Sequence, residues 1–305
     1  MQQAILELRW GAESGTKRIL APGDRIRVGR KPQAHWIVDD EKLSGTHFEI
    51  AYDGTSCEVS DLKSATGTHV GGQKIEAPVA VGNNGWIRAG ETDFMVYLEA
   101  STPPEDDELD LMLAAEEGDL EPNTAGYVEQ CRDELLRKQK RRDTQRAEAL
   151  SRLEAVEGGL FAVLDASRDE RVLTLMRESV ETYRSLYEGL EGESLEHVAP
   201  YLVSLPKGSS LLRRIVTEGF LKRWAIFIEY PRGFKDLRQH LRRFLMVADA
   251  DTRRKFYFRF YDPGVLRAFL PTSTPKQRSE LFGEITAIYL ENDHGRIARL
   301  SAEGA

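Results

Sequence analysis

The residues of this chain best suited to chemistry are one arginine and a set of hydroxyl side chains in the first third of the sequence. Arg30 is followed by Ser44 and Thr46, and then by Ser64 and Thr66. A guanidinium donates charge-assisted hydrogen bonds to a phosphate group. Hydroxyls and backbone N–H groups can complete such a site around the three acceptor oxygens of a phosphorylated side chain. The residue types therefore indicate an anion site of the phosphate class.

These residues belong to four short motifs that follow one another in order. The motifs are Val28-Gly29-Arg30, Ser44-Gly45-Thr46-His47, Asp61-Leu62-Lys63-Ser64-Ala65-Thr66-Gly67-Thr68-His69-Val70, and Gly72 with Ile75. Together they resemble the signature of the forkhead-associated (FHA) domain, a β-sandwich that binds phosphothreonine peptides. The resemblance implies that Arg30 and Ser44 contact phosphate and that His47 braces the loops. The full expected phosphopeptide-binding set is Arg30, Ser44, Gly45, Thr46, Ser64 and Thr66.

Two departures from the FHA pattern leave the role of phosphate open. Family members often carry Asn or Arg where Gly45 stands, and Thr-Asn where Ala65 and Thr66 stand. Thr66 keeps a hydroxyl, whereas Ala65 does not. The domain is expected to bind either a phosphorylated peptide or a partner that it docks without phosphate.

The pattern around these motifs is that of a β-domain over residues 1–100. Short apolar runs alternate with polar residues, and turn signals such as Asp53-Gly54 and Gly71-Gly72 separate them. Short strands at this spacing predict a β-sandwich or barrel. Such a domain holds its binding loops at the ends of rigid strands.

The middle of the chain contains an acidic segment followed by a segment with helical spacing. Residues 101–124 are acidic and predict a linker, because few apolar side chains are available to form a core. Residues 125–157 have helical spacing and contain the basic run RKQKRRDTQR. A helix that is polar all round is usually solvated, and nucleic-acid binding is the weaker alternative for this run. The sequence predicts a long charged linker helix.

Residues 158–305 alternate apolar strands with amphipathic helices. The strand runs include LFAVLDA, PYLVSL, RWAIFIEY and KFYFRFYD. Alternation of this kind predicts an α/β domain with a mainly parallel sheet. The expected architecture of the chain is therefore an FHA sandwich, a long linker helix and a C-terminal α/β domain.

The C-terminal domain also resembles a known family. FAVLDASRD, SLYEG, VAPYLVSL, HLRRFL and FRFYDPGVLRAFLPT occur in the order seen in a family first catalogued as a domain of unknown function. That family is similar to the effector-loading adaptors, or chaperones, of type VI secretion systems. The resemblance implies a protein that binds a toxic effector and delivers it to a VgrG-type spike protein. It implies no cofactor and no catalysis.

Candidate partner-binding residues in this domain are polar or aromatic side chains inside the matching segments. His240 and Arg242 share a helix with Arg243, which also permits an anion or catalytic site. Asp262 followed by Pro263 predicts a helix start, so its role as a cap competes with a binding role. Any of these residues can equally belong to the core. The candidates are Tyr201, His240, Arg242, Arg259, Tyr261 and Asp262.

Composition narrows the function classes further. The net charge of −8 is unlike that of a general nucleic-acid binder, which carries a basic face. Cys57 and Cys131 have no CxxC partners, and the six histidines are scattered, so no metal site is expected.

The N-terminus lacks a secretory-signal pattern, and two separate thiols suit a reducing compartment, so a bacterial cytoplasmic protein is expected. No GxSxG, P-loop or HExxH motif is present, which disfavours an enzyme. The alternative function is a phosphothreonine-dependent signalling scaffold unrelated to effector loading.

Overall fold

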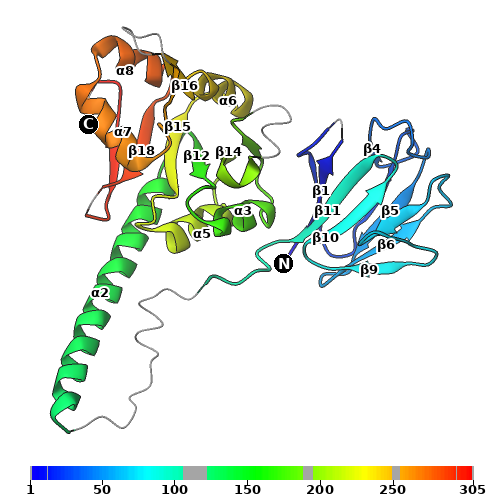
Figure 1. Cartoon of the computed structure of the whole chain (residues 1–305), viewed down its shortest axis with the longest axis horizontal. Helices are drawn as coiled ribbons and strands as arrows, with labels where there is room; N and C mark the ends of the chain where they lie inside the picture. Colours follow the sequence, from blue (N-terminus) through cyan, green and yellow to red (C-terminus); the bar gives the residue numbers. More distant parts are fainter. Residues whose placement is uncertain are drawn as a thin grey trace. The chain divides into compact units, whose positions relative to one another are not determined.

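The computed structural model describes residues 2–11, 13–105, 122–187, 195–248, 255–292 and 294–303. The chain divides into two compact units, both drawn in Figure 1. The first unit comprises Met1–Pro103 with Thr174–Thr182, and the second comprises Pro104–Leu173 with Tyr183–Ala305. Most of the segment predicted as an acidic linker, residues 106–121, lies outside the described residues.

The first unit contains two β-sheets. One sheet has the strand order β2-β1-β11-β10-β7-β8 and the other has the order β4-β3-β5-β6-β9. The strands are β1 (Ala4–Trp10), β2 (Lys17–Leu20), β3 (Arg25–Gly29), β4 (Trp36–Ile37), β5 (Phe48–Tyr52), β6 (Cys57–Asp61), β7 (Thr68–Val70), β8 (Gln73–Lys74), β9 (Val79–Val81), β10 (Gly85–Ala89) and β11 (Thr92–Leu98).

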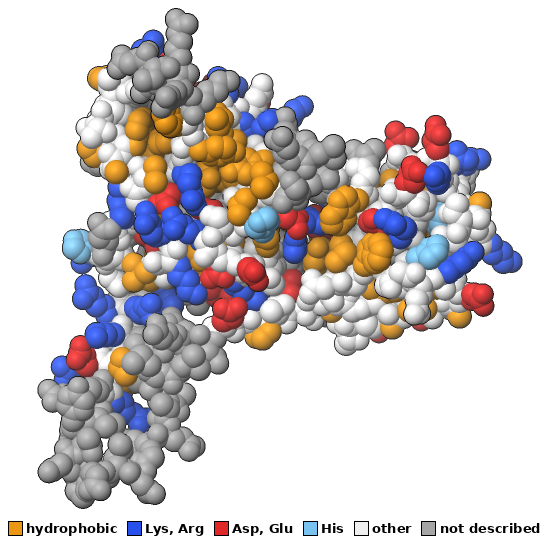
Figure 2. Space-filling view, in the orientation of Figure 1, with side chains coloured by type: hydrophobic (Ala, Val, Ile, Leu, Met, Phe, Trp, Pro, Cys, Tyr) orange, Lys and Arg blue, Asp and Glu red, His pale blue; other side chains and the backbone are white. Residues whose placement is uncertain are grey.

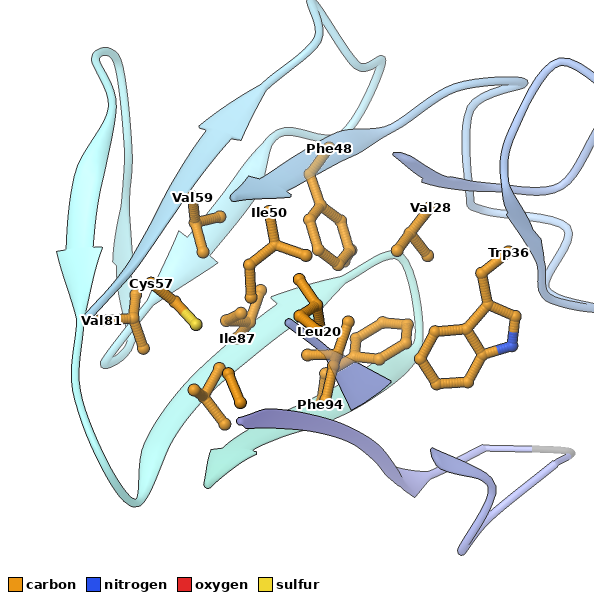
Figure 3. Close-up of a cluster of buried hydrophobic side chains, with 14 of the residues drawn as sticks. Leu20, Val28, Trp36, Phe48, Ile50, Cys57, Val59, Val81, Ile87 and Phe94 are labelled. Atoms are coloured by element: carbon orange, nitrogen blue, oxygen red, sulfur yellow. The ribbon is translucent and has the colours of Figure 1, made fainter. Parts of the chain in front are cut away.

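Alternating side chains of the two sheets form one core. In β5, Phe48, Ile50 and Tyr52 are buried while the residues between them are half-buried, as the two-residue period of a strand requires. Phe94 of β11 meets Phe48 edge-to-face at a centroid distance of 5.3 Å, and it meets Trp36 at 5.6 Å. Figure 3 shows side chains from both sheets pointing into this cluster. The predicted N-terminal β-sandwich is confirmed.

The second unit is built on a six-stranded sheet with helices on its two faces. The sheet order is β13-β14-β12-β15-β18-β19. Its strands are β12 (Gly159–Asp165), β13 (Tyr183–Ser185), β14 (Pro200–Ser204), β15 (Ala225–Tyr230), β18 (Ala287–Glu291) and β19 (Ile297–Leu300). The helices are α2 (Pro122–Glu154), α3 (Glu170–Arg177), the 3-10 turn η1 (Glu196–Val198), α5 (Ser210–Gly219), α6 (Phe234–Arg242), α7 (Pro263–Thr272) and α8 (Pro275–Phe282).

The prediction of a mainly parallel sheet is wrong, because every neighbouring strand pair in this sheet is antiparallel. Strands β14 and β15 are each antiparallel to β12, so they run in the same direction and are joined through α5. This is a split βαβ unit, in which another strand lies between the two parallel strands. The predicted alternation of strands and helices is therefore present, whereas the predicted parallel pairing of the strands is wrong.

Burial on both faces explains why the strands resemble those of a parallel sheet. Ile226 and Ile228 of β15 belong to the core cluster that also contains Leu237 of α6 and Leu266 of α7. The alternate residue Phe227 lines a small cavity with side chains of α5 and α2 on the other face. Strands covered on both faces are continuously apolar, whichever direction their neighbours run.

Two further elements of the second unit bear on the predictions. The predicted long charged helix is present as α2, and its last turns belong to the second unit: Leu153 is buried and Arg152 Nη1 donates to the Ile297 carbonyl at 2.8 Å. The segment KFYFRFYD is a strand only over β17 (Lys255–Tyr257), which pairs with β16 (Met246–Ala248) in a separate two-stranded sheet. No helix of the described residues is both long and apolar enough to cross a bilayer.

Candidate phosphate-binding loops and a buried arginine–aspartate cluster

The loop that begins at Ser44 lies directly against the end of β3. The Arg30 N–H donates to the Ser44 carbonyl at 3.1 Å, and the Lys31 N–H donates to the Gly45 carbonyl at 3.2 Å. Gly29 makes this approach possible, because a Cβ at position 29 would lie 2.3 Å from the Gly45 oxygen. The Arg30 side chain is exposed. The structure therefore brings Arg30 and Ser44 together, as predicted.

The Ser44 side chain joins its loop to the loop before β7. Its Oγ accepts a hydrogen bond from the Ala65 N–H at 2.9 Å. A serine hydroxyl has one donor proton in addition to its acceptor lone pairs. Because Ser44 is the acceptor in this bond, its own proton is left to donate to a ligand.

The buried His47 side chain connects the same two loops through its two ring nitrogens. Its Nδ1 accepts from the Ser44 N–H at 3.1 Å, and its Nε2 lies 3.1 Å from the Gly67 carbonyl. This pairing assigns the proton to Nε2, so the ring is the neutral tautomer. The side chain is fully buried, and burial lowers the pKa of His47. His47 is thus a structural residue of the site, in agreement with the prediction.

Asp61 organises the loop that contains Ser64 and Thr66. Its carboxylate accepts from the Ser64 Oγ at 2.6 Å, the Ser64 N–H at 3.0 Å and the Thr68 Oγ1 at 2.7 Å. Burial opposes its charge, but these hydrogen bonds hold the pKa of Asp61 below its ordinary value. The Ser64 hydroxyl also accepts from the Gly67 N–H at 2.9 Å, so both of its bonding functions serve the loop.

The other predicted members of this site line its outer surface. Thr66 is exposed, and Gly45 and Thr46 are half-buried. Thr66 lies beside Gly67, whose φ of 83° is in the region that favours glycine. The loops present an exposed guanidinium, a serine hydroxyl and the polar edge of a tight turn on one side of the sandwich.

The second unit contains a buried cluster of opposite charges at the end of β12. Asp165 is fully buried and accepts from the Ser167 N–H at 3.1 Å and the Ser167 Oγ at 2.7 Å. It also forms an ion pair with Arg259, and Arg168 Nε lies 3.6 Å from its carboxylate. Arg259 is stacked near the ring of Tyr261, with the guanidinium carbon 5.7 Å from the ring centroid.

Asp262 is the second carboxylate of this cluster and the N-cap of α7. Its Oδ1 accepts from the Gly264 N–H at 2.7 Å and from the Val265 N–H at 3.2 Å. Its side chain is also paired with Arg168 and Arg223. Arg168 therefore connects Asp262 to Asp165. Burial opposes the charge of Asp262, but the two backbone N–H groups and the arginines hold its pKa below the ordinary value.

Two family models match separate segments of the chain. Residues 26–90 match the model of the FHA domain, and residues 160–280 match a family described as a domain of unknown function, DUF4123. The chain is a fusion of an FHA domain and a DUF4123 domain. Arg30, Ser44 and Asp61 lie within the FHA match, and Asp165 and Asp262 lie within the DUF4123 match.

Relatives found by sequence and by structure match a quarter to a third of the chain. The transcriptional regulatory protein EmbR of Mycobacterium tuberculosis is 29% identical over 76 residues, which is 25% of this chain and 20% of EmbR. The chain thus spans a fifth of the length of the curated relatives it matches. The FHA domain of CT664 from Chlamydia trachomatis is 29% identical and covers 31% of this chain and 96% of its own, with a TM-score of 0.30. EmbR in complex with a low affinity phosphopeptide is 27% identical and covers 33% of this chain and 26% of its own, with a TM-score of 0.29.

The remaining candidates in the DUF4123 domain occupy separate places. Tyr201 of β14 is buried, and its hydroxyl donates to the Glu196 carbonyl at 3.0 Å. His240 is buried on α6, and its Nε2 donates to the Leu281 carbonyl at 2.8 Å. Arg242 Nε donates to the Leu186 carbonyl at 3.0 Å. Of the six candidates, Arg259, Tyr261 and Asp262 are brought together in the arginine–aspartate cluster, while Tyr201, His240 and Arg242 each bond a backbone carbonyl elsewhere in the domain.

Among the described residues of the DUF4123 domain, the largest group of exposed apolar side chains was not part of the candidate set. Met246, Val247, Phe256 and Tyr257 expose 45%, 37%, 51% and 54% of their surface, and all four lie in the hairpin β16–β17. Figure 2 shows hydrophobic side chains gathered on the visible face of this domain. The signal was the run KFYFRFYD, whose alternate aromatics cannot all be buried by a two-stranded ribbon. Among the described residues, no group of three or more His, Cys, Asp or Glu side chains is arranged to hold a metal ion.

Proposed function

We propose that the FHA domain binds a threonine-phosphorylated segment of a partner protein through Arg30 and Ser44. The observation that carries this proposal is the hydrogen bond from the Ala65 N–H to the Ser44 Oγ, which leaves the hydroxyl proton to donate to phosphate. Arg30, held next to Ser44 by its backbone, supplies the positive charge. His47 and Asp61 keep the two loops in place before a ligand arrives.

Binding of phosphothreonine peptides to the full-length chain tests this proposal. A fluorescein-labelled oriented phosphothreonine library should yield peptides that bind, and their unphosphorylated forms should bind at least tenfold more weakly. Arg30→Ala and Ser44→Ala should each lower the affinity about tenfold or more, the value of one charge-assisted hydrogen bond. Arg25→Ala is the matched control, because Arg25 is an exposed arginine of the same sheet that pairs with Glu49 at 3.1 Å. Equal affinity for phosphorylated and plain peptides would remove phosphate from the function.

The DUF4123 domain is proposed to act as a type VI secretion adaptor that binds a toxic effector and loads it onto a VgrG-type spike protein. The match of residues 160–280 to DUF4123 supports this, together with the resemblance of the segments from FAVLDASRD to FRFYDPGVLRAFLPT. Such an adaptor works by binding, in the bacterial cytoplasm before secretion, and needs no cofactor. The internal contacts of Arg259, Tyr261 and Asp262 support the fold, and the exposed hairpin β16–β17 is the surface proposed for the partner.

Co-purification with an effector and a spike protein encoded beside this gene tests the adaptor role. Phe256→Asp should reduce effector capture, because it places a charge in a surface where Phe256 is 51% exposed. Tyr257→Asp should reduce it too, but it also removes the edge-to-face contact with Tyr187 at 5.8 Å, so Phe256→Asp is the cleaner variant. Leu136→Asp is the control, since Leu136 is 48% exposed on α2. If neither protein co-purifies with the folded chain while phosphopeptide binding persists, the chain is a phosphothreonine-dependent signalling scaffold.

A further inference from the structure

Two lysine side chains of the FHA domain cross the two glycines of the recognition loops. Lys31 lies over Gly45: a Cβ placed on Gly45 would be 3.1 Å from Lys31 Cδ and 3.5 Å from its Cγ. The absence of a side chain at position 45 therefore leaves the space that the Lys31 stem occupies. Gly45 follows Ser44 directly, so the stem of Lys31 lies beside the residue next to Ser44.

Lys74 of β8 crosses the other loop in the same way. A Cβ on Gly67 would lie 2.3 Å from Lys74 Cε and 2.9 Å from Lys74 Nζ. The Gly67 carbonyl is also the partner of His47, and the loop residue Ala65 donates to Ser44. The two crossed glycines thus belong to loops that are bonded directly to each other.

Among the residues that the structure describes, no carboxylate forms an ion pair with Arg30, Lys31 or Lys74. The ion pairs of this domain use other cations, such as Arg25 with Glu49, Arg88 with Asp93 and Lys42 with Glu91. Lys31 and Lys74 are both exposed. In a chain with a net charge of −8, a group of unneutralised cations at one pair of loops favours a ligand with more negative charge than a single phosphate.

We propose that Lys31 and Lys74 form a cationic frame on either side of Ser44 that selects phosphothreonine segments with acidic neighbouring residues. This inference rests on the proposed phosphopeptide function of the FHA domain and names the class of peptide. Arg30 and Ser44 hold the phosphate, Lys31 adds a second cation beside it, and Lys74 attracts an acidic side chain next to the phosphothreonine. A side chain at position 45 or 67 would make the neighbouring lysine shift from its place beside the loop.

Binding of three designed probes to the full-length chain tests this frame. The probes carry one phosphothreonine flanked by glutamates, by alanines or by lysines. The parent chain should prefer the glutamate probe to the lysine probe by about tenfold or more at low salt, with the preference falling as salt rises. Lys31→Met and Lys74→Met should each weaken the glutamate probe about three- to tenfold and reduce its advantage over the lysine probe. Methionine keeps the apolar stem over the glycine and removes only the charge.

Lys42→Met is the control, because Lys42 lies two residues before Ser44 but its Nζ is paired with Glu91 at 2.5 Å. It should change each affinity less than twofold. If the two lysine variants bind all three probes as the parent does while Arg30→Ala loses binding, the frame is refuted and the phosphopeptide function stands. If the parent binds no phosphothreonine probe, the proposed function itself fails.

Discussion

Replacement of Asp262 tests whether the buried charge cluster of the DUF4123 domain is a source of stability. Asp262 exposes 2% of its surface, accepts two backbone N–H groups of α7 and pairs with Arg168 and Arg223. Asp262→Asn keeps the cap oxygen but removes the charge, whereas Asp262→Ala removes both. The two variants together separate the ion pairs from the helix cap.

The magnitudes follow from the surroundings of each group. Loss of one member of a fully buried ion pair costs about 3–5 kcal/mol. The side chains of Arg168 and Arg223 are 30% and 45% exposed, so water can partly solvate them once Asp262 is gone. We therefore expect Asp262→Asn to cost about 1.5–3 kcal/mol. Loss of the N-cap adds about 1 kcal/mol in Asp262→Ala.

Hydrogen–deuterium exchange of peptides from β12 along a urea gradient measures the free energy of unfolding of the DUF4123 domain within the full-length chain. Asp236→Asn, which changes an exposed carboxylate in the first turn of α6, should alter the stability by less than about 0.5 kcal/mol. The folded-state pKa of Asp262 is lowered, so its contribution is present above the unfolded pKa and is lost as pH falls through the folded value. The gap between parent and Asp262→Asn should therefore close below about pH 4. An Asp262→Asn cost under about 0.5 kcal/mol at pH 7 would refute the argument from burial.

Three further outcomes are expected. His47→Ala should lower FHA stability and weaken phosphopeptide binding together. Because burial lowers the pKa of His47, the parent should also lose stability as pH falls below about 6.5, which urea unfolding at several pH values will show. Burial raises the pKa of Cys57 to about 12, so mass mapping at pH 8 should find this thiol unmodified by a maleimide unless urea is present. Burial raises the pKa of Glu291 to about 7, so the folded state holds its proton below that pH, and stability should fall as pH rises from about 5 to 7. Glu291→Gln should flatten that dependence, and an unchanged slope would contradict it.

The FHA domain was largely predictable because its signals are local. Strands with a two-residue period and turns with glycine at positive φ, such as Gly67, appear directly in the sequence. The motif also predicted that Arg30 and Ser44 lie side by side, and the hydrogen bond from the Arg30 N–H to the Ser44 carbonyl holds them there. The role of Ser64 could not be predicted, because the sequence does not show whether a hydroxyl points into its loop or toward a ligand. In the structure the Ser64 hydroxyl bonds Asp61 and the Gly67 N–H within the loop.

The DUF4123 domain was predictable in its elements and not in their arrangement. Strands such as β12 and the cap of α7 at Asp262 were readable, because apolar runs and an Asp-Pro pair are local features. The antiparallel sheet was not readable, because a strand buried on both faces has the same composition whichever way its neighbours run. The insertion of β12 between β14 and β15 depends on residues far apart in the chain.

Amino-acid order alone established two domains, a β-sandwich with a phosphate-type motif and a domain of alternating strands and helices, because periodicity and turn chemistry act over a few residues. Three-dimensional packing decided strand direction, the burial of Asp165 and Asp262 among arginines, and the placement of Lys31 over Gly45. Those features arise from contacts between distant segments, whose energies depend on distance and burial rather than on neighbours in the chain.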